Sequence, residues 1–253
     1  MILAFTFIFG TILGSFLNVV ILRHNSGMTT GGRSMCFSCG KTLHWHELLP
    51  VVSYVMLRGK CSQCKSGISL QYPVVELVTG LIYMCIGWYL SPLLATMPIM
   101  FITKFVYYAY LFSLLVVLSV YDWRHKIIPD DFVYLFSIMS FVLLFFETGS
   151  AFSLHVPTLS QVLAGPVLAL PFAGLWFVSK GRWIGFGDAK LALGMGFLLG
   201  MGGGLAAVLI AFWVGAIVGV VLLLLKKYGF TMKSEIPFAP FLVLGTLVSF
   251  FLG

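Results

Sequence analysis

The chain has 253 residues, of which 15 are Lys or Arg and 8 are Asp or Glu, so charged residues make up only 9%. A soluble globular domain carries about 25% charged residues, whereas here 60% of the residues are apolar and the mean hydropathy is +1.05. This composition excludes a water-soluble single domain, and the 24 Phe, 10 Tyr and 6 Trp exclude intrinsic disorder. The apolar runs are continuous rather than alternating, which favours membrane helices over an outer-membrane barrel. We therefore predict an all-α polytopic membrane protein.

The net charge of +7 is not evidence for nucleic-acid binding here. That function needs a basic face on a soluble module, and in this chain the basic residues lie in short segments between apolar runs. In a membrane protein such segments set the orientation, because Lys and Arg concentrate on the cytoplasmic side. We expect membrane lipid around the chain and no nucleic-acid partner.

In chain order, the apolar runs predict about eight transmembrane helices. Residues 191–225 form an uncharged stretch of 35 residues, which would be about 52 Å long as one helix and so too long for a bilayer core of about 30 Å. We expect this stretch to fold back at the glycine-rich residues 200–204, since glycine tolerates turn conformations. The expected spans are residues 1–22, 72–90, 99–121, 131–146, 160–179, the two arms of 191–225, and 236–252.

This arrangement places 14 of the 15 Lys and Arg on one side, with Lys104 as the exception. By the positive-inside rule that side is cytoplasmic and the N-terminus is outside. The first run lacks the basic region and cleavage site of a secretory signal, so we interpret it as a retained span. The chain then divides into a first transmembrane helix at 1–22, a cytoplasmic insert at 23–71 and a membrane-embedded domain at 72–253.

Four of the five cysteines form two CxxC pairs in the insert, separated by 21 residues: Cys36, Cys39, Cys61 and Cys64. Four thiolates at this spacing suit tetrahedral zinc, with each pair on a tight turn helped by Gly40 or Gly67. Two disulfides or a redox pair are the alternatives, but persistent disulfides are rare in a reducing cytoplasm. His44 and His46 are possible substitute ligands, although we expect ordinary loop histidines. The fifth cysteine, Cys85, lies within the second span and is expected to be a small buried side chain.

Two aspartates lie at the expected cytoplasmic border of the spans. Asp122 ends the third span and Asp188, in the sequence Gly185-Phe186-Gly187-Asp188, starts the sixth. Facing carboxylates suit a two-aspartate hydrolase, in which one takes a proton from water while the other, protonated, polarises the scissile carbonyl. The glycines allow the backbone to bend and to approach a substrate strand closely.

Structural roles for these acids remain open at this stage. Asp188 can cap the sixth span, and Asp122 can pair with Arg124 or Lys126. Asp130 and Asp131, which follow Pro129, are expected to cap the fourth span. Glu76, slightly inside the second span, can cap, pair with Lys65 or line a polar site. Glu147 and Lys104 lie near the outer face, far from the other candidates.

Taken together, several segments resemble the bacterial type IV prepilin peptidase family, whose members are membrane aspartic proteases with a GxGD motif. The segments occur in family order over nearly the whole chain. They are GSFLNVVILR at 14–23, the two CxxC pairs, ISLQYPVVE at 68–76, YDWRHKIIPD at 121–130, GFGDAKL at 185–191 and IPFAP at 236–240. Members often have a proline after the arginine of the first segment and another inside the first CxxC, where this chain has His24 and Phe37.

The resemblance implies a fold of about eight helices with a small zinc-binding insert, and catalytic roles for Asp122 and Asp188 supported by motif residues Gly185, Gly187, Pro129 and Lys190. It implies cleavage of the short basic leader of prepilins or pseudopilins on the cytoplasmic side of the bacterial inner membrane. It also implies methylation of the new N-terminal residue with S-adenosyl-L-methionine. The family associates methylation with the N-terminal third, so we assign the donor site loosely to the insert and Glu76.

The expected substrate path runs through the membrane. The apolar helix of the prepilin enters the bundle from the lipid while the basic leader stays in the cytoplasm. Basic residues near the aspartates would repel that leader, so we expect them to contact lipid phosphate or an acidic position of the pilin; they are Arg124, Lys126, Lys190 and Lys233. Three other functions remain: a peptidase without methylation, a membrane thiol oxidoreductase using the CxxC pairs, and a small transporter using Asp122, Asp188 and Glu76.

Overall fold

A computed structural model describes residues 1–27, 29, 31–146, 154–225 and 236–253. Within these ranges the chain is helical, with no strand and only isolated β-bridges. Five of the described helices are long and apolar enough to cross a membrane: α1 (Ile2–Arg23), α3 (Gln71–Tyr89), α5 (Pro98–His125), α7 (Leu159–Ser179) and α8 (Phe186–Leu225). This confirms the predicted all-helical membrane class.

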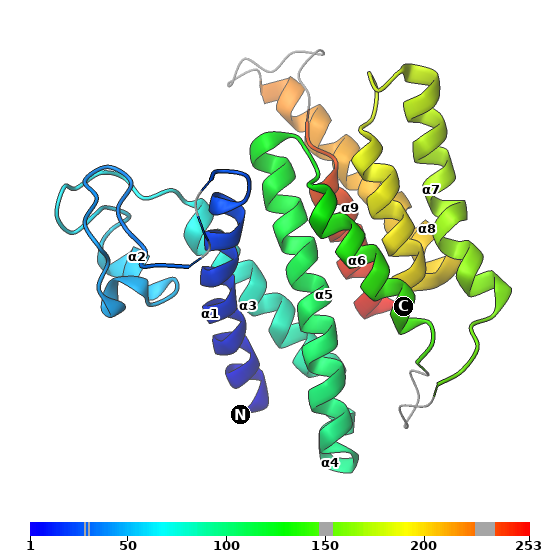
Figure 1. Ribbon diagram of the computed structural model, residues 1–253, viewed down its shortest axis with the longest axis horizontal. Helices are drawn as coiled ribbons and strands as arrows, with labels where there is room; N and C mark the ends of the chain where they lie inside the picture. The colour runs from blue at the N-terminus through cyan, green and yellow to red at the C-terminus, as the bar shows by residue number, and fades with distance from the viewer. Residues whose placement is uncertain (28, 30, 147–153, 226–235) are drawn as a thin grey trace. The chain divides into compact units, whose positions relative to one another are not determined.

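Shorter helices complete the described part of the fold (Figure 1): α2 (Val52–Met56), α4 (Ser91–Thr96), α6 (Asp130–Leu143), α9 (Ala239–Leu252) and the 3-10 helix η1 (Trp45–Leu48). The predicted spans coincide with α1, α3, α5, α6, α7, α8 and α9 to within a few residues. Glu147, Lys226, Lys227 and Lys233 lie outside the described residues. The number of membrane crossings stays a prediction.

The chain forms two compact units, Met1–Ser113 and Leu114–Gly253. In the first unit α1 packs against α3 through small residues. A Cβ on Gly10 would lie 2.7 Å from the Cβ of Tyr83, and one on Gly14 would lie 2.8 Å from the Cα of Glu76. The Tyr83 hydroxyl also bonds to the Ser113 hydroxyl at 2.9 Å, which ties α3 to the middle of α5.

In the second unit α8 packs against α6, α7 and α9. It is broken at Gly200, whose φ of 69° and ψ of −174° are not helical. Contacts with α7 show that the chain reverses there. In the arm before Gly200, the Phe186 ring lies 4.9 Å from the Trp176 ring of α7, measured between centroids. In the arm after Gly200, the Phe212 ring lies 6.2 Å from the Phe172 ring of α7. The reversal predicted at the glycine cluster is therefore seen at its first glycine.

Close helix contacts fix the second arm of α8 against α9. A Cβ on Gly245 of α9 would lie 2.1 Å from the carbonyl oxygen of Ala207. The Ser249 hydroxyl donates to the carbonyl oxygen of Gly203 at 2.7 Å. Small residues at such contacts let helix backbones approach closely, which is the main source of attraction between helices in lipid.

Candidate functional site

Asp122 lies on the last turn of α5, which extends four residues beyond the predicted end of the third span. The Lys126 amide donates to the Asp122 carbonyl at 2.7 Å and continues the helical pattern. The Asp122 side chain is buried, and its Oδ2 accepts a hydrogen bond of 3.1 Å from the backbone amide of Ala239, the first residue of α9. The orientation of this carboxylate therefore depends on a helix 117 residues further along the chain.

Asp188 lies in the first turn of α8 and is also buried. Its backbone amide donates to the Gly185 carbonyl at 3.3 Å. Its Oδ1 has no hydrogen-bond partner among the residues that the structure describes, and the Asp122 carboxylate is close enough to interact with it electrostatically. A buried carboxylate oxygen without a partner is costly. This oxygen is therefore a place for a water molecule or a substrate group.

Contacts between the two aspartate segments hold them together. Gly187 packs against Ile128, where an added Cβ would lie 2.7 Å from the Ile128 Cβ. The Lys190 ammonium lies 2.6 Å from the Asp130 carboxylate. The Ser137 hydroxyl of α6 donates to the Lys190 carbonyl at 3.3 Å. The loop after α5, the start of α6 and the start of α8 therefore form one connected support for the carboxylates.

These contacts correct the expected role of Asp130 and Asp131. Asp130 and Asp131 do not cap α6: its N-cap is Pro129, and the helix has no side-chain cap bond. Asp130 instead pairs with Lys190, whose ammonium also lies over the rings of Tyr134 and Phe186 at 4.8 and 5.3 Å. Gly187 lies close to Ile128, and the approach to a substrate strand expected of the GxGD glycines stays a prediction.

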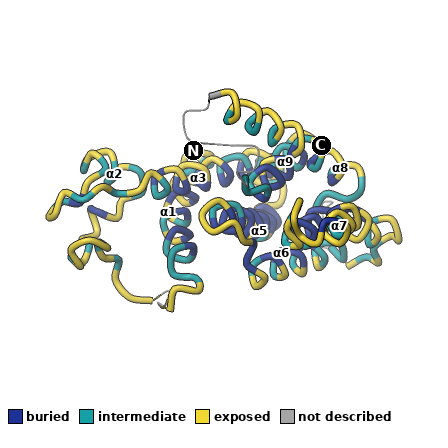
Figure 2. The backbone as a smooth tube through the Cα atoms, turned by 90° about the horizontal axis from the view of Figure 1, so that it is seen from above, coloured by how far each residue is buried: buried dark blue, intermediate teal, exposed yellow. Residues whose placement is uncertain are grey.

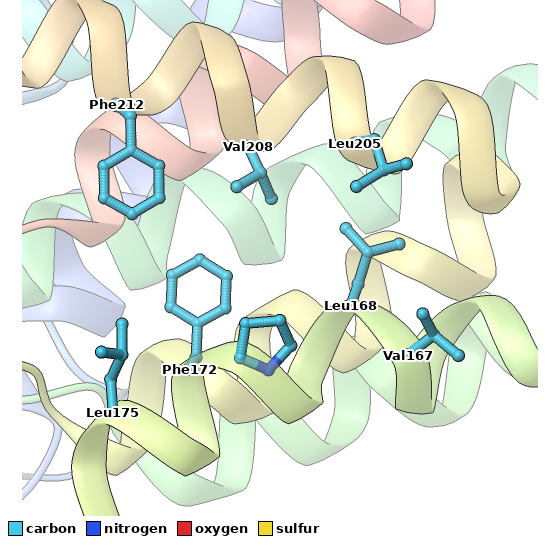
Figure 3. A pocket seen from close by; sticks show the side chains of 8 residues that line it. Val167, Leu168, Phe172, Leu175, Leu205, Val208 and Phe212 are labelled. Atoms are coloured by element: carbon cyan, nitrogen blue, oxygen red, sulfur yellow. The ribbon is translucent and has the colours of Figure 1, made fainter. Parts of the chain in front are cut away.

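An apolar pocket lies between α7 and the second arm of α8 (Figure 3). Its volume is about 90 Å³, and side chains from the two helices point toward one another across it. The rings of Phe172 and Phe212 line this pocket. Their centroids lie 6.3 and 5.0 Å, respectively, from the centroid of the Phe238 ring. Because Phe238 precedes Ala239, the aromatic end of this pocket is one residue from the amide that binds Asp122.

The four predicted metal ligands come together in the first unit. The Sγ atoms of Cys36, Cys39, Cys61 and Cys64 all lie within 4.8 Å of one another, and those of Cys36 and Cys64 are 3.8 Å apart. Tetrahedral zinc with bonds of about 2.3 Å sets its sulfur ligands about 3.8 Å apart. The thiol cluster can therefore hold a metal ion. His44 and His46 lie outside this cluster, and so does the half-buried Cys85.

The two CxxC turns have the same backbone pattern. The Cys36 amide donates to the Lys41 carbonyl at 2.9 Å, and the Cys61 amide donates to the Ser66 carbonyl at 2.8 Å. In the first turn Gly40 adopts φ +71°, as predicted for a tight turn. The prediction for Gly67 is wrong, because Lys65 takes the equivalent left-handed conformation with φ 60°.

Ser66 supports thiolates from both pairs. Its hydroxyl lies 3.7 Å from the Cys36 sulfur and 3.1 Å from the Cys64 sulfur. Backbone amides of Cys39 and Ser38, followed by the Ser66 hydroxyl, lower the pKa of Cys36 to about 6, and Ser66 lowers the pKa of Cys64. Since metals bind the thiolate form, these contacts favour the metal-binding form of Cys36 and Cys64.

A buried glutamate joins the two halves of the insert. Glu47 accepts hydrogen bonds from the His44 amide and the Lys41 ammonium, both at 2.8 Å, and from the Ser62 hydroxyl. The His44 amide, then Lys41 and Ser62, lower the pKa of Glu47 to about 2. Lys41 follows the first CxxC pair and Ser62 lies inside the second, so Glu47 connects the two turns.

Glu76 joins the insert to α3. Its Oε2 accepts a hydrogen bond of 2.7 Å from the Val51 amide, and the Ser15 hydroxyl of α1 donates to the same carboxylate. The sequence left three roles open for Glu76: capping, pairing with Lys65 and lining a polar site. The structure supports a polar contact, which lies inside the first unit. Val51 has φ 61°, a left-handed conformation that a β-branched residue rarely adopts.

Sequence reasoning missed the Ala239 amide and the Ile128 contact. The IPFAP segment was a signal for the first, since a proline at the start of a helix marks free backbone amides. No sequence signal identified Asp122 as the acceptor of this amide, because the bond depends on how α5 and α9 pack.

In comparisons with known proteins, the N-terminal part of the chain and the part that carries the two aspartates match separate family models. Residues 8–90 match the Bacterial Peptidase A24 N-terminal domain, and residues 109–220 match the Type IV leader peptidase family. A prepilin leader peptidase/N-methyltransferase of Xanthomonas campestris is 30% identical over 96% of this chain and 89% of its own length. The protein of the same name from Bacillus subtilis is 30% identical over 99% of this chain and 94% of its own length. The one from Pseudomonas aeruginosa is 27% identical over 98% of this chain and 89% of its own length. No solved structure matches the chain significantly.

Proposed function

This chain belongs to the type IV leader peptidase family, and on that premise we propose that it removes the short basic leader of prepilins or pseudopilins and N-methylates the new N-terminal residue. The chain is a multi-pass membrane protein. We place it in the bacterial inner membrane with the reacting groups at the cytoplasmic border, because the basic segments favour that orientation. The names of its relatives do not favour a thiol oxidoreductase.

Asp122 and Asp188 are the proposed catalytic residues. Two buried carboxylates in electrostatic contact cannot both ionise easily, so they share one proton. The ionised carboxylate takes a proton from water as the oxygen attacks the scissile carbonyl carbon, and the protonated one donates to the carbonyl oxygen. Breaking the C–N bond then returns a proton to the leaving amine. The main support is the Asp188 Oδ1, which is buried without a partner in the described structure, on a carboxylate close enough to Asp122 to interact with it electrostatically.

The remaining motif residues act as supports. The Gly185 carbonyl accepts a hydrogen bond from the Asp188 amide, Gly187 leaves room for Ile128, and Pro129 is the N-cap residue of α6. Because the Lys190 ammonium is paired with Asp130, it ties α6 to α8 and is not directed at a basic leader.

The apolar helix of the substrate enters from the lipid. The pocket between α7 and α8 offers it apolar side chains, including Leu175, Leu205 and Phe212, that are 40 to 51% exposed. Through Phe238 this surface is connected to the residue that binds Asp122. A helix lying there would carry its polar leader toward the carboxylates.

We propose that the thiol cluster holds a structural Zn²⁺, which connects the two turns of the insert when bound. The methyl donor is S-adenosyl-L-methionine, which supplies an electrophilic methyl group. The pocket between α7 and α8 is lined by apolar side chains and does not suit this charged, polar molecule. Glu76 stays the candidate for the donor site, through its position between the insert, α1 and α3.

Mass spectrometry of a model prepilin incubated with the protein and S-adenosyl-L-methionine tests the function. We expect loss of the leader and a gain of one CH₂ on the mature N-terminus. Asp188→Asn should reduce cleavage by at least about 10²-fold, because it removes a proton-transfer group. Asp131→Asn is the matched control, since Asp131 is exposed and lies outside the proposed site.

Three outcomes distinguish the parts of this proposal. Leader loss without the added CH₂ would leave a peptidase alone. Substantial cleavage by folded Asp188→Asn protein would refute the two-aspartate mechanism. Failure of the folded wild-type protein to cleave several prepilins would refute the function.

A further inference from the structure

An apolar face of the insert is exposed on α2. Val52, Val55 and Met56 recur at positions i, i+3 and i+4, so they share one side of this short helix. Their exposed fractions are 52, 67 and 75%, and the nearby Trp45 is 77% exposed. Figure 2 shows the same segment with exposed and intermediate residues throughout α2. Large apolar side chains exposed together on one side of a helix indicate a place where something binds.

Exposed basic residues accompany this face. Arg33, Arg58, Lys60 and Lys65 are exposed, and the fifth basic residue of segment 24–70, Lys41, is paired with Glu47. Glu47 is the one acid in the segment, which gives it a formal charge of 5 − 1 = +4. Four thiolates around Zn²⁺ would add a charge of about −2, so the metal-loaded insert stays positively charged. An acidic surface is the complement of this charge.

A hydrogen bond sets the position of this face along α3. Val51 immediately precedes α2, and its amide donates to Glu76, five residues after the start of α3 at Gln71. Because α3 is a candidate membrane span, the start of α2 lies level with the first turns of a membrane helix. This is the depth at which a span leaves the hydrocarbon core and meets the lipid headgroups.

We propose that the face formed by Trp45, Val52, Val55 and Met56, flanked by Arg58 and Lys60, binds the anionic lipid surface of the membrane that the chain itself spans. Tryptophan and aliphatic side chains of amphipathic segments enter the headgroup boundary, and Lys and Arg are attracted to anionic lipid. A second copy of the insert carries the same positive charge and would be repelled. The bound lipid fixes the insert beside the inner end of α3.

Photocrosslinking in nanodiscs tests this inference on the full-length protein. Benzoylphenylalanine replaces Val55 on the proposed face or, as the control, Gln63, an exposed polar residue in the second CxxC turn. We expect mass spectrometry to show lipid adducts several-fold more abundant at position 55. Their yield should at least double when phosphatidylglycerol replaces a third of the phosphatidylcholine, and Arg58→Gln with Lys60→Gln should remove that increase.

The opposite results would refute the proposal. Equal adduct yields at positions 55 and 63 would show that the face has no special contact with lipid. Crosslinks from position 55 to another protein chain in place of lipid would identify a different occupant. Metal content measured on each variant shows that the insert is intact, so a low lipid yield cannot be attributed to misfolding.

Discussion

Cys61 is the one buried apolar side chain among the described residues of the insert, whereas α5 buries every residue from Leu114 to Leu118. In Figure 2 α5 is largely dark blue, whereas α2 is yellow and teal. The insert is stabilised by a thiol cluster and by hydrogen bonds to Glu47 and Glu76. The helices that carry the aspartates are stabilised by close packing. The two regions should therefore respond to different perturbations.

Removing one proposed metal ligand should produce the largest difference between the insert and the helices that carry the aspartates. Cys61→Ser is expected to lower bound zinc from about one equivalent to near zero, because structural zinc contributes about 10 kcal/mol to small zinc modules. Hydrogen exchange across residues 36–66 should rise sharply, while exchange in α8 and α9 stays the same. Elemental analysis and exchange mass spectrometry measure the two quantities.

Cys85→Ser is the matched control for that experiment, since Cys85 lies outside the thiol cluster. Its zinc content and exchange should match the wild type. Zinc retained by Cys61→Ser, or absent from wild-type protein purified without chelator, would contradict the proposed metal site.

A glycine substitution should destabilise the helices that carry the aspartates and leave the insert unchanged. Gly245→Ala places a Cβ 2.1 Å from the Ala207 carbonyl oxygen, so α9 must shift from α8. We expect a loss of about 3 kcal/mol in the stability of the helical unit, and reduced cleavage, because α9 provides the amide that binds Asp122. Zinc content should not change.

Gly174→Ala is the control, because a Cβ at this position of α7 meets nothing within 4 Å. It should be neutral or slightly stabilising, by up to about 1 kcal/mol. A thermal unfolding transition equal in the two variants would show that the α8–α9 contact does not support the unit.

A smaller effect should follow from loss of the Glu47 carboxylate. Glu47→Gln is expected to destabilise the insert by about 1–3 kcal/mol at neutral pH, because three donors lose a charged acceptor. The pKa of Glu47 is lowered from 4.5 to about 2, so its stabilisation is present above pH 4.5 and is lost as the pH falls from 4.5 to 2.

Hydrogen exchange of residues 41–62 between pH 7 and pH 3 tests this pH dependence. Acid also protonates the thiolates in both proteins, so the quantity compared is the difference between wild type and variant at each pH. That difference should be constant above pH 5 and shrink below 4.5. A difference that is as large at pH 3 as at pH 7 would assign the effect to packing rather than charge.

The same contrast explains what could be predicted from the sequence. The thiol cluster is encoded by local spacing, so all four of its cysteines were identified, and only the turn residue differed, with Lys65 in place of Gly67. The helix positions followed from the apolar runs. The contacts that orient the aspartates were not predictable, since the Ala239 amide and the Asp130–Lys190 pair join residues 117 and 60 positions apart. Such contacts depend on helix packing rather than on any local pattern.

The smallest effect is expected at the pair that joins α6 to α8. The Asp130 side chain is 60% exposed, and exposed ion pairs contribute about 0–1 kcal/mol. After Asp130→Asn, the Lys190 ammonium still lies over the Tyr134 and Phe186 rings. Cleavage should therefore fall by less than about fivefold relative to Asp131→Asn, because a contribution below about 1 kcal/mol changes a rate by less than about fivefold. A loss as large as that of Asp188→Asn would instead make Asp130 part of the reacting group.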